Sequence, residues 1–234
     1  IKSDDEMMAM RRSIFACEKS MELMRNHFKP GITEQELWSR FQMEAVSRGA
    51  EWIETRLLAA GPRANPWYQE CSSRPILNGE LMGFDTDLVG SYGYCTDMSR
   101  TWLCGDEKPT DEQKEIYTMG YEQIQSNMEL LRPGTTFKEL TLNSKEYSKD
   151  EFRHYSLLFH GVGLCDEFPA IPFSWELNEN SFDGVLKPGM VMCVETYVGR
   201  FSGGPGVKLE EQVLVTENGH ELLTSYPFES DLLF

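Results

Sequence analysis

The chain has 234 residues, enough for one sizeable hydrophobic core or a compact pair of half-domains. Its net charge of −16 argues against non-specific nucleic-acid binding, which needs a basic surface. No apolar run approaches the roughly 20 residues that span a bilayer, and no signal peptide opens the chain, so we expect a cytoplasmic protein that does not enter a membrane. Since the first residue is Ile1, we expect a segment of a longer protein with a further N-terminal domain.

The six cysteines match no zinc-binding or redox spacing. Several lie among apolar residues, such as Cys193 in the segment 191–194. We interpret them as buried free thiols in a reducing compartment.

The first half of the chain predicts two helices followed by strands. Methionine and isoleucine recur at near-helical spacing over 4–28, and Pro30-Gly31 ends that helix. Thr33 is the expected N-cap of a second helix, with Glu36 completing a capping box, and Gly49 ends it. Three further segments have strand character: 53–60, 75–89 and 93–104.

The second half repeats this order. A third helix is expected from Asp111 to Leu131, followed by strands over 189–198, 206–216 and 221–224, with a hairpin turn at Asn218-Gly219. Segment 132–140 echoes segment 29–37, because both follow a long helix, contain Pro-Gly and open a new helix. Such corners are common, so the echo alone is weak. We predict one α+β domain over 1–234, with two related αβ halves and a strongly bent antiparallel sheet between helices.

Six residues that bind metals in many proteins stand among apolar residues or glycines: Asp85, Asp87, Asp97, His160, Glu195 and Glu210. An ionised carboxylate inside a strand is costly unless it is paired or bound to metal. Taken singly, each has an ordinary explanation. Asp97 has Arg100 nearby as an ion-pair partner, His160 suits a core histidine, and Glu211 suits the charged face of an edge strand. Together, carboxylates with one imidazole suit two divalent ions, which would neutralise their repulsion.

The same segments, in this order, resemble the creatinase and methionine-aminopeptidase superfamily, which has the pita-bread fold. The resemblance covers nearly the whole chain and is specific as a set of motifs: Gly93-Tyr94-x-x-Asp97-x-Ser99-Arg100-Thr101, His160-Gly161-x-Gly163, Glu195 at a strand end, and Lys208-x-Glu210-Glu211. It implies metal ligands at Asp87, Asp97, His160, Glu195 and Glu210. Asp97 and Glu210 would bridge two ions, and Glu211 would be the outer acid. Asp85 would be a sixth ligand or a neighbour that supports the others.

Two departures from the aminopeptidases of this superfamily change the expected chemistry. The spacing of 10 from Asp87 to Asp97 is one residue shorter than usual. Asp166 stands where those enzymes have a second, peptide-binding histidine, and Tyr155 stands where several have a further histidine. These details resemble the peptidase-like dimethylsulfoniopropionate (DMSP) lyases, which release dimethyl sulfide and acrylate by β-elimination.

The resemblance implies a mechanism for a small zwitterionic substrate. Two divalent metal ions would bind its carboxylate, with iron favoured and Mn, Zn or Co as alternatives, and Asp166 would remove the Cα proton. Tyr155 would hold the substrate by its hydroxyl. An aromatic face would attract the sulfonium, with Trp67, Tyr68 and Trp175 as candidates. The resemblance also implies a homodimer.

Other functions stay open from the sequence. An Xaa-Pro aminopeptidase or prolidase shares every ligand, and it would be favoured if the alignment around Asp166 were shifted by a residue or two. A binding module that has lost catalysis usually loses metal ligands, and a creatinase-like hydrolase works without them. The complete ligand set argues against both.

Overall fold

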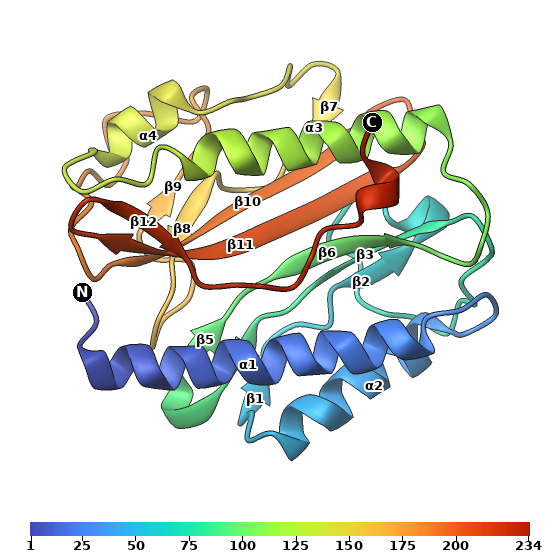
Figure 1. The fold of residues 1–234 in the computed structure, drawn as a ribbon. Helices are drawn as coiled ribbons and strands as arrows, with labels where there is room; N and C mark the ends of the chain where they lie inside the picture. Colours follow the sequence, from blue (N-terminus) through green and yellow to red (C-terminus); the bar gives the residue numbers. More distant parts are fainter.

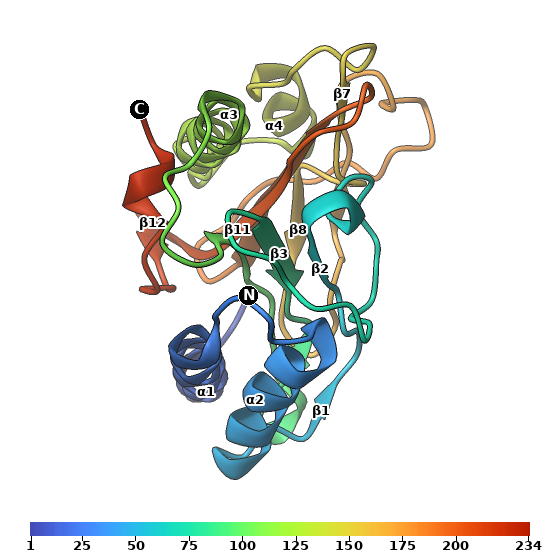
Figure 2. The same ribbon diagram turned by 90° about the vertical axis from the view of Figure 1, so that its right-hand side faces the viewer.

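The computed structural model describes residues 1–234 and has helices on both sides of a central set of strands (Figure 1). On one side lie α1 (Asp4–His27) and α2 (Glu34–Ser47), and on the other α3 (Asp111–Met128) and α4 (Phe137–Asn143). Figure 2 shows the same order of layers after a quarter turn. The predicted α+β class is therefore confirmed.

The strands form three hydrogen-bonded sheets in which every pair is antiparallel. The largest has the order β12 (Gly219–Leu222), β11 (Gly206–Thr216), β10 (Val191–Arg200), β8 (Phe159–Gly161) and β9 (Ala170–Ile171), with β7 (Phe152–Arg153) also paired to β10. The second has the order β2 (Leu58–Ala60), β3 (Leu81–Asp85) and β6 (Ser99–Leu103), and the third β1 (Trp52–Ile53), β4 (Leu88–Val89) and β5 (Cys95–Thr96). A single strongly bent sheet is thus not confirmed.

Every α-helix begins at a capping box, in which a hydroxyl and an acidic or amide side chain satisfy the first backbone N–H groups. The box predicted at Thr33 and Glu36 is present. The other three are Ser3 with Glu6, Thr110 with Gln113, and Thr136 with Glu139. Local sequence therefore determines where these helices start.

The two Pro-Gly corners are built alike. Gly31 and Gly134 both have a φ of +91°, a conformation that glycine adopts without strain. The Gly31 N–H donates to the Ile76 carbonyl at 2.8 Å, and the Gly134 N–H donates to the Leu186 carbonyl at 2.9 Å. The echo between segments 29–37 and 132–140 therefore corresponds to one repeated backbone arrangement.

Several predicted elements are shorter or shifted. The strand expected over 53–60 is interrupted after Ile53, and the one expected over 75–89 begins only at Leu81 and breaks between Asp85 and Leu88. The last hairpin turns one residue earlier than predicted, because Gly219 already pairs with Thr216. Helix α3 ends at Met128, three residues before the predicted end at Leu131.

Each half has its own hydrophobic core. One core packs α3 and α4 against the large sheet, and the other packs α1 and α2 against β2, β3 and β6. The halves meet where β6 lies beside β11: the Thr101 hydroxyl accepts the Lys208 N–H at 3.0 Å and donates to the Lys208 carbonyl at 2.9 Å. This seam brings side chains from both halves together.

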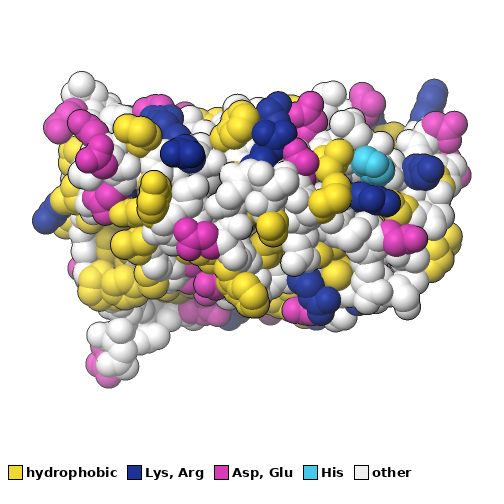
Figure 3. All heavy atoms as spheres, turned by 90° about the horizontal axis from the view of Figure 1, so that it is seen from below, with side chains coloured by type: hydrophobic (Ala, Val, Ile, Leu, Met, Phe, Trp, Pro, Cys, Tyr) yellow, Lys and Arg dark blue, Asp and Glu magenta, His cyan; other side chains and the backbone are white.

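The face formed by α1 and α2 mixes acidic, basic and apolar side chains without a continuous basic area (Figure 3). Helix α1 carries acidic residues in its first turn and basic residues in its last, the arrangement that suits the helix dipole. None of the helices combines the length and the apolar composition that a membrane span requires.

Candidate metal centre

The six predicted ligands come from both halves of the chain. Asp85 ends β3, Asp87 follows it, and Asp97 lies between β5 and β6. The other three lie on the large sheet: His160 on β8, Glu195 on β10 and Glu210 on β11. The register places Glu195 directly opposite Glu210. Glu195 therefore lies in the middle of its strand, whereas the sequence predicts that it lies at the end.

His160 lies at the centre of the cluster. Its Nε2 is 3.2 Å from Glu210 Oε1, 3.5 Å from Glu195 Oε1 and 3.6 Å from Asp97 Oδ2. All four side chains are buried. Atoms that each bind one metal ion at about 2 Å lie about 3–3.5 Å from one another, so this spacing fits a shared cation.

Some carboxylate oxygens of the cluster have no partner. Asp97 Oδ1 and Glu195 Oε1 are buried and accept no hydrogen bond. Such atoms are costly to bury, and a cation would satisfy them. Two groups of side chains have ligand atoms within 4.8 Å of one another and share Asp97: one also contains His160, Cys193 and Glu210, and the other Asp87 and Asp166. The donor set therefore fits two adjacent divalent ions.

The acidic groups disturb one another's titration. Burial, followed by repulsion from Glu210 and Asp85, raises the pKa of Asp97 well above its usual range. Burial and the charge of Asp85 raise the pKa of Asp87 to about 7. Burial also acts on Glu210, but the Lys208 ammonium and His160 outweigh it and lower the pKa of that carboxyl. So many carboxylates are unfavourable together unless cations neutralise them.

Lys208 supplies one such positive charge. Its Nζ is buried and lies 3.0 Å from Asp85 Oδ2, 2.8 Å from Glu195 Oε2 and 3.0 Å from Glu210 Oε2. Asp85 also accepts a hydrogen bond from the Ser99 hydroxyl at 2.5 Å, and it belongs to neither group that shares Asp97. Strand alternation places Lys208 and Glu210 on one face, but the sequence gives no sign of the pairing with Asp85.

Two ordinary explanations for these acids are wrong. Arg100 does not pair with Asp97: its Nη2 lies 2.8 Å from Glu211 Oε1, and both side chains are buried. Glu211 does not face solvent on an edge strand either, because β11 lies between β10 and β12. The Thr224 hydroxyl also donates to Glu211. Asp97 is thus left without an arginine partner.

Asp166 lies at the edge of the cluster with one oxygen held and one free. Its Oδ1 accepts the Glu167 N–H at 3.0 Å and lies 3.4 Å from His160 Nδ1. Oδ2 is the oxygen without a partner. The loop is held close to β8 because the Gly161 N–H donates to the Pro169 carbonyl at 2.9 Å, and any side chain at Gly161 would collide with the Phe168 carbonyl.

Aromatic rings lie beside the cluster. The Lys208 Nζ is 4.2 Å from the centre of the buried Tyr155 ring. Tyr68, which is half exposed, stacks on Tyr155 with ring centres 5.4 Å apart. Of the other proposed aromatics, Trp67 stacks on Tyr197, whereas Trp175 packs against Phe173 and His154.

The structure contains only free thiols, as predicted, and five of the six are buried. Cys165 is exposed. Cys193 packs in a hydrophobic cluster, as its sequence context indicates, and it also lies opposite His160 in the register of β10 and β8, beside the carboxylate–histidine cluster.

Residues 8–217 match the family model of metallopeptidase family M24. The chain belongs to family M24. It is 46% identical to the dimethylsulfoniopropionate lyases DddP of Roseovarius nubinhibens and of Roseobacter denitrificans, in matches that cover 100% of this chain and 54% of each relative. The fold is similar to that of an Xaa-Pro dipeptidase from Bacillus anthracis, with a TM-score of 0.83 and 28% identity over 98% of this chain and 63% of that one. This M24 chain thus spans about half the length of the curated relatives it matches.

Proposed function

We propose that this chain is the catalytic domain of a metal-dependent lyase that cleaves DMSP to dimethyl sulfide and acrylate. The observation that carries the proposal is the 46% identity, over the whole chain, to two DMSP lyases. The free oxygen of Asp166 beside the carboxylate–histidine cluster supports it. A cytoplasmic location and a homodimeric state are further parts of the proposal.

The residues that would hold two divalent ions are Asp87, Asp97, His160, Glu195 and Glu210, with Asp85 as the additional carboxylate. Iron is the proposed metal, and Mn, Zn or Co are alternatives that the donor set also suits. When bound, the ions would supply electrostatic stabilisation for the substrate carboxylate and for the negative charge that develops beside it.

Asp166 is the proposed base. Because Glu167 and His160 hold Oδ1, the unpartnered Oδ2 is oriented to accept the proton from the substrate Cα. The electrons of the broken C–H bond form the Cα–Cβ double bond of acrylate. The electrons of the Cβ–S bond leave on sulfur, which departs as neutral dimethyl sulfide and needs no acid.

Tyr155 is the proposed substrate-binding residue. Its buried ring already contacts the Lys208 ammonium, 4.2 Å from the ring centre, and the stacked Tyr68, so its hydroxyl is the group proposed to hold the substrate. The half-exposed Tyr68 offers an aromatic surface for the sulfonium. The proposed substrate would have its carboxylate among the cluster residues and its sulfonium against Tyr68.

A headspace assay of dimethyl sulfide tests the proposal, using protein loaded with iron and DMSP as the substrate. We expect sulfide and acrylate in equal amounts, with no cleavage of an Xaa-Pro dipeptide under the same conditions. The similarity to the B. anthracis Xaa-Pro dipeptidase favours one alternative, a metallopeptidase. Dipeptide cleavage without sulfide release would support that alternative and refute the lyase proposal.

A further inference from the structure

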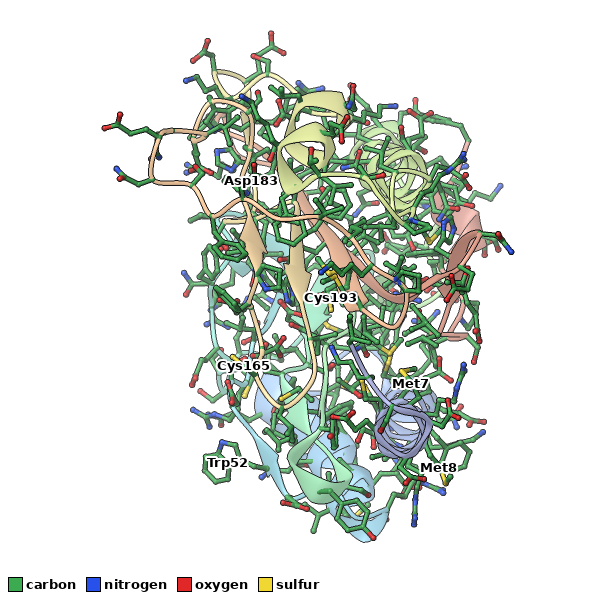
Figure 4. All side chains as sticks on the ribbon, turned by 90° about the vertical axis from the view of Figure 1, so that its left-hand side faces the viewer. Met7, Met8, Trp52, Cys165, Asp183 and Cys193 are labelled. Atoms are coloured by element: carbon green, nitrogen blue, oxygen red, sulfur yellow. The ribbon has the colours of Figure 1, made fainter.

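Cys193 is the thiol that lies within the candidate metal centre. It is completely buried on β10, two residues before Glu195, so both side chains lie on the same face of the strand. The register places it directly opposite His160. Figure 4 shows Cys193 in the middle of the molecule, whereas Cys165 and Trp52 lie nearer its edge.

The sulfur has the right neighbours for a metal ligand. Cys193 Sγ and one ligand atom each from Asp97, His160 and Glu210 all lie within 4.8 Å of one another. A second, independent observation points to a ligand: the Asp97 carboxylate is 3% exposed, and its Oδ1 has no hydrogen-bond partner. The Lys208 ammonium contacts Glu195 and Glu210, and Asp97 Oδ1 is left without a partner.

We propose that Cys193 is a thiolate ligand of the metal ion that His160 binds. The sulfur adds a soft donor to the carboxylates of Asp97, Glu195 and Glu210 and the imidazole of His160. Thiolate and imidazole favour Fe, Co and Zn, whereas sites made of carboxylates alone suit Mn and Mg. The thiolate therefore makes this position of the centre selective for the softer ions. The inference rests on the metal centre of the proposed function and is independent of which reaction the centre catalyses.

Cobalt binding tests the proposal by absorption spectroscopy. Cobalt bound to the protein gives visible ligand-field bands, and a thiolate ligand adds a charge-transfer band in the near ultraviolet. We expect both features in the wild type and in Cys104→Ala, which removes a buried thiol outside the cluster. We expect Cys193→Ser to keep the ligand-field bands, to lose the charge-transfer band, and to lower the preference for Co over Mn at least about tenfold.

A measurement without any substitution covers the case in which Cys193→Ser does not fold. X-ray absorption fine structure of the zinc-loaded wild type should show a sulfur neighbour at about 2.3 Å. Ligand-field bands with only nitrogen and oxygen neighbours would refute the role of Cys193 and leave the metal centre standing. No ligand-field bands in the wild type would refute the metal centre as well. Headspace analysis of the same samples reports the lyase reaction separately.

Discussion

The pair formed by Arg100 and Glu211 connects the two halves behind the metal centre. Arg100 also donates to the Glu210 carbonyl at 2.6 Å, so it supports the strand that carries a proposed ligand. Glu211→Gln leaves a buried arginine without its counter-charge, and we expect it to lower the free energy of unfolding by about 3–5 kcal/mol in urea denaturation. Glu22→Gln, which breaks the exposed pair with Lys19, should have little effect. Equal stability of the two variants would contradict this role.

Tyr155 combines a hydroxyl with an aromatic face, and the two contributions can be separated. Tyr155→Phe keeps the face and removes one hydrogen-bonding group, so we expect KM for DMSP to rise about 2–10-fold with kcat nearly unchanged. Tyr155→Ala also removes the ring on which Tyr68 stacks, and it should raise KM further because Tyr68 is then no longer held in place. Steady-state kinetics of both variants provides the measurement, and an unchanged KM for Tyr155→Ala would exclude Tyr155 from substrate binding.

Sequence motifs identify individual residues of the site better than their partners. The candidate ligands stand out because charges inside apolar strands need an explanation. The partner of Arg100, the contacts of Lys208 and the position of Cys193 depend on how distant strands align across the seam between β6 and β11. A one-residue change of register reverses the faces of a strand, and the sequence alone does not set that register.

At the level of elements, the helix starts are the features most directly determined by sequence. Thr33 and Thr136 occupy matching positions at the two Pro-Gly corners. Thr33→Ala and Thr136→Ala should each lower the free energy of unfolding by about 1 kcal/mol, measured by urea denaturation. Because the two caps lie in separate halves, their effects should add in the double variant. A loss at one corner only would show that the corners are not energetically equivalent.

Helices and the two long strands of the large sheet could be predicted because caps and alternation are local signals. The short strands could not. β7 and β9 have two residues each, and their pairing with β10 and β8 comes from tertiary contacts. The break after Asp85 likewise follows from the cluster, since Asp87 leaves the strand where the Thr55 hydroxyl donates to it.

For the whole molecule, stability should depend on metal and pH together. The raised pKa of Asp87, about 7, means that the metal-free folded state binds a proton more tightly than the unfolded state, whose aspartate has a pKa of about 4. Protonated Asp87 thus contributes to the free energy of unfolding of the metal-free protein. This contribution is complete below about pH 4 and is lost as the pH rises through about 7. Metal replaces that proton, so added divalent ions should raise Tm more at pH 8 than at pH 6. Calorimetry with and without chelator measures this, and an equal shift at both pH values would contradict it.

The central claim is that Asp166 is the base of the elimination and that the metal ions bind to the other residues of the centre without it. Release of dimethyl sulfide from DMSP by Asp166→Asn, compared with the wild type at equal measured metal content, tests this claim most directly. Asp183→Asn, in an exposed loop, provides the matched control. We predict unchanged metal content and a loss of about 100-fold or more in the rate of sulfide release for Asp166→Asn alone. Full activity of that variant with metal bound would contradict the account.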